Sequence, residues 1–270
     1  MSFKKQFQSL TFRDDFMFGV VMSDLSIAKR VISVILADEI PDIENCELQK
    51  SVDNDYDSHS VRYDVYVRTK DGTKVYVVEM QNADNGVLVK RSRYYQSASD
   101  MDFLAKGRPY SELPETYVIF ICDFDIFGRD KAFYRFENYC IGEGIALGDE
   151  TYKVFLNING KTDRKELQSL MSYISGNTPD DELTEKIQDK VDAAKHDGKL
   201  YSSFIKEYQN SLSLKEEGRR EGRREGRKEG EKKGKLEMIK SLLGIGRSIK
   251  EIAEFYKTDE AEIRGILAGA

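Results

Sequence analysis

The sequence has 270 residues, of which 40% are hydrophobic and 33% charged, a composition that suits one core domain with a polar appendage. The net charge of −6 argues against a wholly basic nucleic-acid binder, the three widely spaced cysteines form no zinc pattern, and two histidines are too few for a multi-histidine site. The sequence shows no signal peptide and no apolar run of 18 residues, so we expect a cytoplasmic protein with no membrane partner.

The first part of the chain predicts a helix followed by strands. Apolar residues recur at spacings of three and four between Phe16 and Leu36, which indicates a helix, and Pro41 ends this pattern. We expect a short strand at residues 46–52 and a polar loop at residues 54–60.

Residues 63–81 read YDVYVRTKDGTKVYVVEMQ and predict a β-hairpin whose turn lies at residues 70–73. The elements expected after it are a helix at 88–104, strands within 116–127, 131–140 and 152–160, and helices within 163–208. This order of helices and strands predicts an α/β or α+β core.

Two acids of the hairpin, Asp64 and Glu79, lie equally far along the chain from the turn centre at Asp71 and Gly72. In an antiparallel pair such positions face each other, with their side chains about 5 Å apart on one side of the sheet. Two ionised carboxylates that close repel unless a cation bridges them or one is protonated, and hard cations such as Mg²⁺ prefer carboxylate oxygens. Gln81 shares the face of Glu79. The pattern is compatible with a metal site and also with acids that face solvent on an ordinary hairpin.

Four segments are informative when they are read together: DDFMFGVVMSD, YDVYVRTKDGTKVYVVEMQ, KRSRYYQSASDMDFLAKGRPYSELPETYVIFICDFDIF and EEGRREGRREGRKEG. Together they resemble the PD-(D/E)XK nuclease-family transposases, also called recombination-promoting nucleases, from Phe12 to Gly234. The resemblance implies an α/β restriction-endonuclease-like core, in which helices flank a mixed β-sheet. It also implies DNA as the partner, cleavage of DNA phosphodiester bonds as the activity, and Mg²⁺ or Mn²⁺ as the cofactor.

The resemblance also implies roles for individual residues. Asp64 matches the motif aspartate and Glu79 the next acid, so both are expected to bind the metal. Gln81 stands where the superfamily usually has lysine, which leaves the group that activates water undetermined. An acid from the first helix often completes such sites, and Asp15 is the candidate, although Asp14 or Asp15 could instead cap that helix. The candidate catalytic residues are therefore Asp64, Glu79, Gln81 and Asp15.

The expected helix after the hairpin carries Lys90, Arg91, Arg93 and Tyr95, which are candidate substrate-binding residues. Basic groups contact phosphates, and tyrosine can stack on a base. Arg91 and Tyr95 are four residues apart and share a helix face, which we expect to point toward the acids because the helix follows Gln81 closely. The alternative is an ordinary amphipathic helix with one tyrosine in the core.

A ladder of five glycines, spaced every four residues, runs from Gly218 to Gly234 within residues 215–235, which hold ten Lys and Arg against six Glu. Five glycines in a helix cost roughly 5 kcal/mol relative to alanine. The segment is therefore either a helix that packs on a partner, a flexible charged linker or a basic arm for nucleic acid. Formation of a homo-oligomer and DNA contact are both candidate uses of this extension.

The C-terminal segment predicts three short helices, with a capping box of Ser248 and Glu251 at the start of the second. The expected organisation is a nuclease-like core at residues 1–213, the glycine ladder as helix or linker at 214–235, and a small helix-turn-helix-like module at 236–270.

Two functions follow from these observations. The first is a Mg²⁺-dependent endonuclease that hydrolyses DNA phosphodiester bonds and is linked to recombination or mobile elements. The second is a catalytically inactive nuclease fold that serves as a DNA- or protein-interaction module. Gln81 and the negative charge of residues 1–214 keep the second function open.

Overall fold

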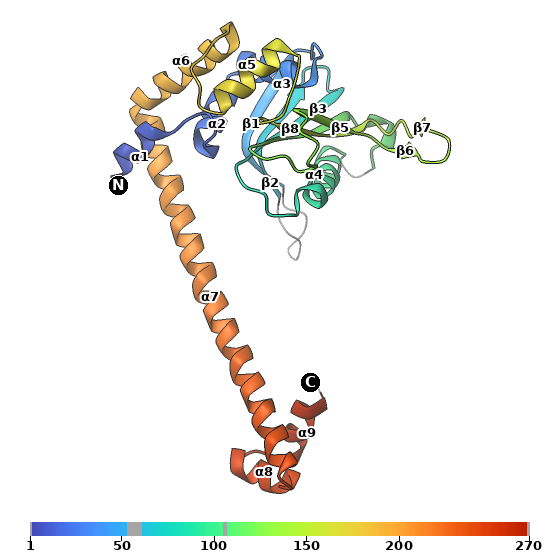
Figure 1. Cartoon of the computed structure of the whole chain (residues 1–270), viewed down its shortest axis with the longest axis vertical. Coiled ribbons are helices and arrows are strands. Elements are labelled where there is room, and N and C mark those ends of the chain that lie inside the picture. Colours follow the sequence, from blue (N-terminus) through green and yellow to red (C-terminus); the bar gives the residue numbers. More distant parts are fainter. Residues whose placement is uncertain (1, 53–60, 105–106, 269–270) are drawn as a thin grey trace. The chain divides into compact units, whose positions relative to one another are not determined.

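The computed structural model describes residues 2–52, 61–104 and 107–268 and contains a six-stranded mixed β-sheet (Figure 1). The strand order is β1-β2-β3-β4-β8-β5. The strands are β1 (Ile43–Val52), β2 (Val61–Thr69), β3 (Lys74–Gln81), β4 (Glu115–Cys122), β5 (Phe133–Phe136) and β8 (Thr151–Asn157). β1, β2 and β3 pair antiparallel, β3, β4 and β8 pair parallel, and β5 pairs antiparallel with β8 at the edge. The expected mixed sheet flanked by helices is confirmed.

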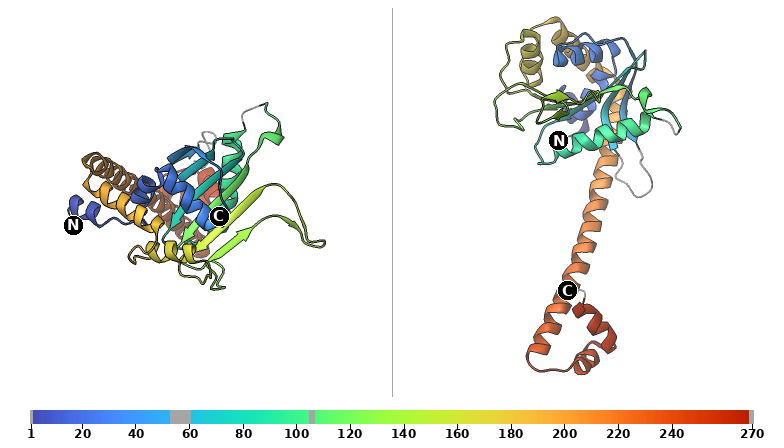
Figure 2. Two further views of the ribbon diagram at one scale, coloured as in Figure 1. Left: turned by 90° about the horizontal axis from the view of Figure 1, so that it is seen from above. Right: turned by 90° about the vertical axis from the view of Figure 1, so that its right-hand side faces the viewer.

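Helices pack on both faces of this sheet (Figures 1 and 2). The core on one face includes α2 (Asp15–Met22), α3 (Leu25–Leu36), α5 (Lys165–Ile174) and α6 (Glu182–His196). The core on the other face is covered by α4 (Leu88–Phe103). The remaining elements before residue 197 are α1 (Phe3–Ser9), a 3-10 turn (Tyr110–Glu112), and a two-stranded ribbon of β6 (Tyr139–Cys140) and β7 (Ile145–Ala146).

The central strands explain the continuous apolar runs of the sequence. β3 and β4 are buried along nearly their whole length because helices cover both faces of the sheet. The hairpin turn between β2 and β3 forms as expected, with Gly72 at a φ of 71° and the Asp71 carboxylate accepting a hydrogen bond from the Thr73 N–H at 3.0 Å. This turn sets the register of the two strands that carry the candidate acids.

The single helix expected from Phe16 to Leu36 is two helices, so that expectation is wrong in detail. The break falls at Asp24, whose carboxylate accepts hydrogen bonds from the backbone N–H groups of Ser26 at 3.1 Å and Ile27 at 3.4 Å. Such an N-cap satisfies the free donors at a new helix start and outweighs the continuous apolar spacing. The polar loop expected at residues 54–60 lies outside the described residues.

The chain divides into two compact units, Met1–Phe204 and Ile205–Ala270. The glycine ladder is helical, because α7 runs without a break from Gly198 to Gly244. It is followed by α8 (Ile249–Tyr256) and α9 (Glu260–Ala268), and the expected capping box starts α8. The use of the glycine ladder in self-association or DNA contact stays a prediction. Among the described helices, none is both long enough and apolar enough to span a membrane.

Candidate active site

Asp64 and Glu79 meet at the end of the β2–β3 pair. The ladder pairs Val65 with Val78, and this register places Asp64 opposite Glu79, as the turn predicts. Here the side chains replace the usual ladder bonds. The Asp64 N–H donates to Oε1 of Glu79 at 2.8 Å, and the Met80 N–H donates to Oδ2 of Asp64 at 3.2 Å. Each carboxylate is therefore held by the backbone of the opposite strand.

The two acids lie in an environment that disfavours their charges. Glu79 is only 2% exposed, which excludes the solvent-facing alternative for this residue. Burial and then the neighbouring Asp64 raise the pKa of Glu79 well above its usual range, although Arg91 opposes this shift. Burial and then the Asp15 carboxylate raise the pKa of Asp64 to about 6. A bound cation would stabilise the ionised form of both carboxylates.

The β2 strand is irregular at Asp64. Tyr63 and Tyr66 stack on each other and pack on the α4 side of the sheet, whereas Val65 packs on the other side. In a regular strand Tyr63 and Val65 would share a face. The change of face falls at Asp64, and Gln49, at the facing position of β1, has a φ of 51°. The strand is thus distorted at the residue whose carboxylate accepts a hydrogen bond from the neighbouring strand β3.

Asp15 is the first residue of α2 and lies near the pair. Its carboxylate raises the pKa of both Asp64 and Glu79, and its own pKa is raised by partial burial and then by Asp14. The Asp15 side chain retains contact with solvent. Arg62 lowers the pKa of both Asp15 and Asp64, so this cation belongs to the same group of charges. The sequence interpretation missed Arg62. Its position on β2, two residues before Asp64, could have identified it as a neighbour of the acids.

Arg91, on the first turns of α4, brings a second cation to the acids. Its Nη2 lies 3.5 Å from Oε2 of Glu79. The guanidinium also lies over the rings of Tyr95 and Phe120, at 5.3 and 5.1 Å from their centroids. Its Nε is buried and has no hydrogen-bond partner among the described residues. Arg91 is thus a largely desolvated cation directed at the buried acid.

The other candidate substrate-binding residues lie in different surroundings. Lys90 and Arg93 are exposed on α4. Tyr95 is buried, packs edge-to-face against Tyr63, and accepts a hydrogen bond from the Tyr63 hydroxyl at its backbone carbonyl, at 3.0 Å. The structure therefore brings Arg91 to the acids, leaves two basic groups at the surface, and encloses Tyr95 in the core on the α4 side.

Gln81 ends β3 and is partly exposed. Its backbone carbonyl accepts a hydrogen bond from the Asp123 N–H at 3.0 Å, which joins the ends of β3 and β4. Its side chain lies at the next position on the face of Glu79. An amide there can donate or accept hydrogen bonds but cannot take up a proton as an amine can.

The chemistry of the donors fits a hard divalent cation. Mg²⁺ is commonly held by one or two carboxylates while it keeps several waters, and Asp64 and Glu79 offer two. Among the described residues Oδ1 of Asp64 accepts no hydrogen bond, so one oxygen of the pair is available to a ligand. Within the ranges that the structure covers, no three Asp, Glu, His or Cys side chains form a ready-made metal cage. The structure thus supports a two-carboxylate site with Asp15 nearby.

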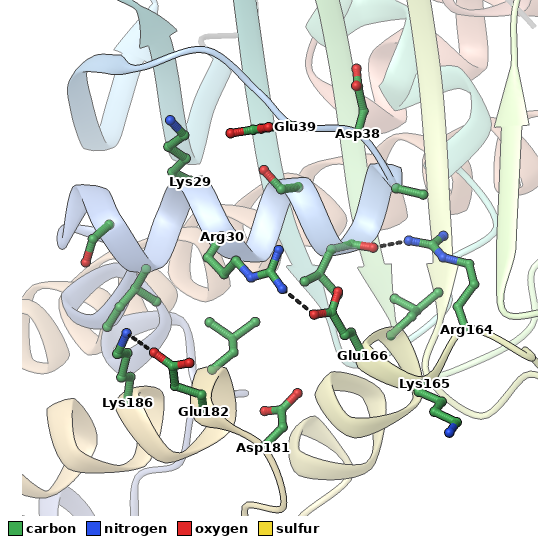
Figure 3. A pocket seen from close by; sticks show the side chains of 17 residues that line it. Lys29, Arg30, Asp38, Glu39, Arg164, Lys165, Glu166, Asp181, Glu182 and Lys186 are labelled. Atoms are coloured by element: carbon green, nitrogen blue, oxygen red, sulfur yellow. Dashed lines mark hydrogen bonds and ion pairs between the residues drawn. The ribbon is translucent and has the colours of Figure 1, made fainter.

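A pocket lies against the helices on the face of the sheet opposite α4. It has a volume of about 1000 Å³ and is lined by residues of α3, α5 and α6 (Figure 3). Arg30 pairs with Glu166 and Lys186 pairs with Glu182, while the Arg164 guanidinium donates to backbone carbonyls at the end of α3. These charged side chains form ion pairs with one another and hydrogen bonds to the end of α3. The pocket is therefore a contact region between helices.

A comparison with known protein families agrees with this geometry. No curated protein and no solved structure matches the chain. One family model does match, over residues 14–175. This range starts just before α2, ends just after α5 and contains Asp15, Asp64, Glu79 and Arg91, although it is narrower than the resemblance seen in the sequence. Because the match covers more than half of the chain, the protein belongs to the PD-(D/E)XK nuclease family transposases.

Proposed function

We propose that the protein is a Mg²⁺-dependent endodeoxyribonuclease in which Asp64 and Glu79 bind the metal. The observation that carries this proposal is the buried carboxylate pair at the end of the β2–β3 ladder, with each acid held by the opposite strand. Membership of the family supports DNA as the partner and metal dependence as the usual property of its members. Mn²⁺ is expected to replace Mg²⁺ because its preferred ligands are also carboxylate oxygens and water.

The chain positions its ligands before any metal binds. The hydrogen bonds from the Asp64 and Met80 N–H groups fix one oxygen of each carboxylate, so little side-chain freedom is lost on binding. A cation bound here would polarise the scissile phosphate and make an attacking water more acidic. Asp15 contributes further negative charge beside the pair, which strengthens the attraction for a cation.

Arg91 compensates for the missing lysine in this proposal. Gln81 cannot supply the positive charge that lysine supplies at its position. The Arg91 guanidinium lies 3.5 Å from Glu79, so it places a positive charge beside the acids from the helix instead of the strand. In this proposal Lys90 and Arg93, which are exposed on α4, contact DNA phosphates, and the ring of Tyr95 supports the Arg91 guanidinium.

One observation favours a second candidate function. Because Gln81 replaces the usual lysine, the fold could bind DNA or another protein without cleaving DNA. The two functions differ in whether the acids are needed for a chemical step, and a single cleavage experiment separates them.

The experiment is nicking of supercoiled plasmid by the purified full-length protein, with Mg²⁺ titrated from zero. We expect nicking that requires Mg²⁺ and that is abolished by Asp64→Ala, which removes a ligand. The matched control is Glu166→Ala, which removes an acid from the opposite side of the sheet and should retain activity. Equal activity of wild type and Asp64→Ala would contradict the site assignment. Absence of metal-dependent nicking in the wild type would favour the non-catalytic function.

A further inference from the structure

Arg13 lies two residues before Asp15 and reaches the ends of two strands. Its guanidinium forms an ion pair with the Asp123 carboxylate, just after β4. Its Nε and Nη2 each lie 3.4 Å from Oδ1 of Asn82, just after β3. Asn82 reciprocates, because its Nδ2 donates to the backbone carbonyl of Arg13 at 3.1 Å. Both the side chain and the backbone carbonyl of Arg13 therefore bind the segment before α2 to the strand ends.

The residues that receive Arg13 are themselves held in place. Nδ2 of Asn159 donates to both Oδ1 and the backbone carbonyl of Asp123, each at 3.1 Å. The Asp123 N–H donates to the carbonyl of Gln81 at 3.0 Å. Since Asn159 lies just after β8, the network joins the carboxyl ends of three parallel strands, β3, β4 and β8. This hydrogen-bonded edge of the sheet gives Arg13 its partners.

Asp15 begins α2 two residues after Arg13, so the contacts of Arg13 hold the segment that carries the Asp15 carboxylate. This carboxylate lies near Asp64 and Glu79 and carries the same charge, so the three acids repel one another without a cation. Local helix capping does not hold this segment. The Asp14 side chain makes no cap hydrogen bond to α2 and instead accepts from the backbone N–H and the hydroxyl of Thr11, at 2.7 and 3.0 Å.

We infer that Arg13 is a positioning residue that holds Asp15 beside Asp64 and Glu79 and thereby raises the affinity of the site for a divalent cation. The contact of Arg13 with Asn82 links two chain segments. Asp15 lies two residues after Arg13, and Glu79 lies three residues before Asn82. This inference rests on the metal site of the proposed function. It adds a residue that acts on the metal site through the position of Asp15.

The test is the affinity for Mn²⁺, measured by isothermal titration calorimetry on the full-length protein without DNA. Residues that orient metal ligands typically contribute about 10- to 100-fold in metal affinity, and we expect Arg13→Ala to weaken Mn²⁺ binding by about 10-fold. Asn82→Ala should weaken it in the same direction and by less, and Arg13→Lys should fall between wild type and Arg13→Ala. Arg30→Ala removes a comparable interhelix ion pair, with Glu166, and should leave the affinity unchanged.

A double-mutant cycle separates positioning from a general structural effect. If Arg13 acts through Asp15, adding Arg13→Ala to Asp15→Ala should cause no further loss of Mn²⁺ affinity. Unchanged affinity in Arg13→Ala, or an equal loss when Asp15 is already absent, would overturn the inference. If Arg13→Ala does not fold, as judged by thermal melting without metal, Asn82→Ala decides the question by the same cycle.

The failure of this inference is distinguishable from the failure of the proposed function. A wild-type protein that binds Mn²⁺ but does not nick plasmid would contradict the nuclease activity and leave the Arg13 cycle decisive. A wild-type protein that binds no Mn²⁺ would overturn both. Nicking that is half-maximal at a higher Mg²⁺ concentration in Arg13→Ala, with the same rate at saturation, is the expected result in the activity assay.

Discussion

Arg91 and Glu79 form an ion pair in which the acid is almost completely buried and Nη2 lies 3.5 Å from Oε2. The cation comes from the helix that follows the hairpin, and the acid comes from the hairpin itself. A lysine at position 81 would bring its charge to the site along the strand. Here a positive charge reaches Glu79 from α4 instead of from β3.

Removing Arg91 should destabilise the protein in a pH-dependent way. In Arg91→Ala the buried Glu79 loses its cation, so its folded-state pKa rises further above the unfolded value. The loss of stability should then be small at pH 5, where Glu79 can hold a proton, and about 2–4 kcal/mol at pH 8. Urea denaturation without metal at both pH values measures this difference. Arg93→Ala, at an exposed position of α4, should change stability little, and equal losses at pH 5 and pH 8 in Arg91→Ala would contradict the role of the ion pair.

Replacing Asp64 by asparagine should stabilise the metal-free protein at neutral pH. The folded pKa of Asp64 is about 6, above the usual value for an aspartate in an unfolded chain, so the folded state holds the proton more tightly. Stability therefore falls as pH rises from about 4 to about 6, and the penalty is fully present above the folded pKa. Asp64→Asn should be more stable than wild type by about 3 kcal/mol at pH 7.5, at about 1.36 kcal/mol per pKa unit, and nearly equal to it at pH 4.

Thermal melting at the two pH values, with and without Mg²⁺, checks the Asp64 prediction. Mg²⁺ should raise the melting temperature of the wild type and leave that of Asp64→Asn nearly unchanged. Asp42 serves as the contrasting control, because its pKa is lowered by Lys29 and Asp42→Asn should therefore not stabilise at neutral pH. A less stable Asp64→Asn at pH 7.5 would show that the carboxylate is favourably placed in the absence of metal.

Gln81→Lys should retain or increase plasmid nicking. The substitution restores the usual amine at the end of β3, where the side chain is partly exposed and a lysine can be accommodated. Gln81→Met, of similar length and without polar donors, should reduce activity because it can no longer orient a water. Initial nicking rates at saturating Mg²⁺ measure both variants. Loss of activity in Gln81→Lys together with normal melting would show that the amide itself is required.

The C-terminal extension should be dispensable for folding of the core, provided that the first turns of α7 are kept. Phe7 packs against Phe204 and Tyr201, with ring centroids 5.4 and 5.3 Å away. A chain ending at Ser213 should melt cooperatively close to the core transition of the full-length protein. A chain ending at His196 loses both rings and should melt about 5–10 °C lower. Equal melting of the two shortened chains would remove the packing role of α7.

The residues near the hairpin were predictable because the information is local. The turn at Asp71 and Gly72 and the strands on either side of it determine a register that places Asp64 opposite Glu79. The apolar runs of β3 and β4 and the spacing in α4 likewise determine those elements within a few residues. The capping box at Ser248 is also local, and it starts α8 as the sequence predicts.

Other features depend on segments that are distant in the sequence. Glu79 is buried because β4, which begins 36 residues later, pairs beside β3 and because α4 covers this face, and neither fact is written in the hairpin. The change of face at Asp64 accompanies the unusual backbone of Gln49 on β1. The spacing of Arg91 and Tyr95 predicts a shared helix face, but only the packing of α4 brings the Arg91 guanidinium within 3.5 Å of Glu79 and leaves Lys90 exposed.

The sequence by itself determined the hairpin register that sets Asp64 opposite Glu79, because strand pattern and turn chemistry act over a few residues, and its resemblance to a known family gave the fold class. The tertiary structure alone decided the charges around those acids. Arg13 and Asp123 are 110 residues apart and meet only because parallel strands align their carboxyl ends at one edge of the sheet. Burial at that edge, which shifts the pKa of Asp64 and Glu79, is a property of the assembled layers, and no single segment of the chain contains it.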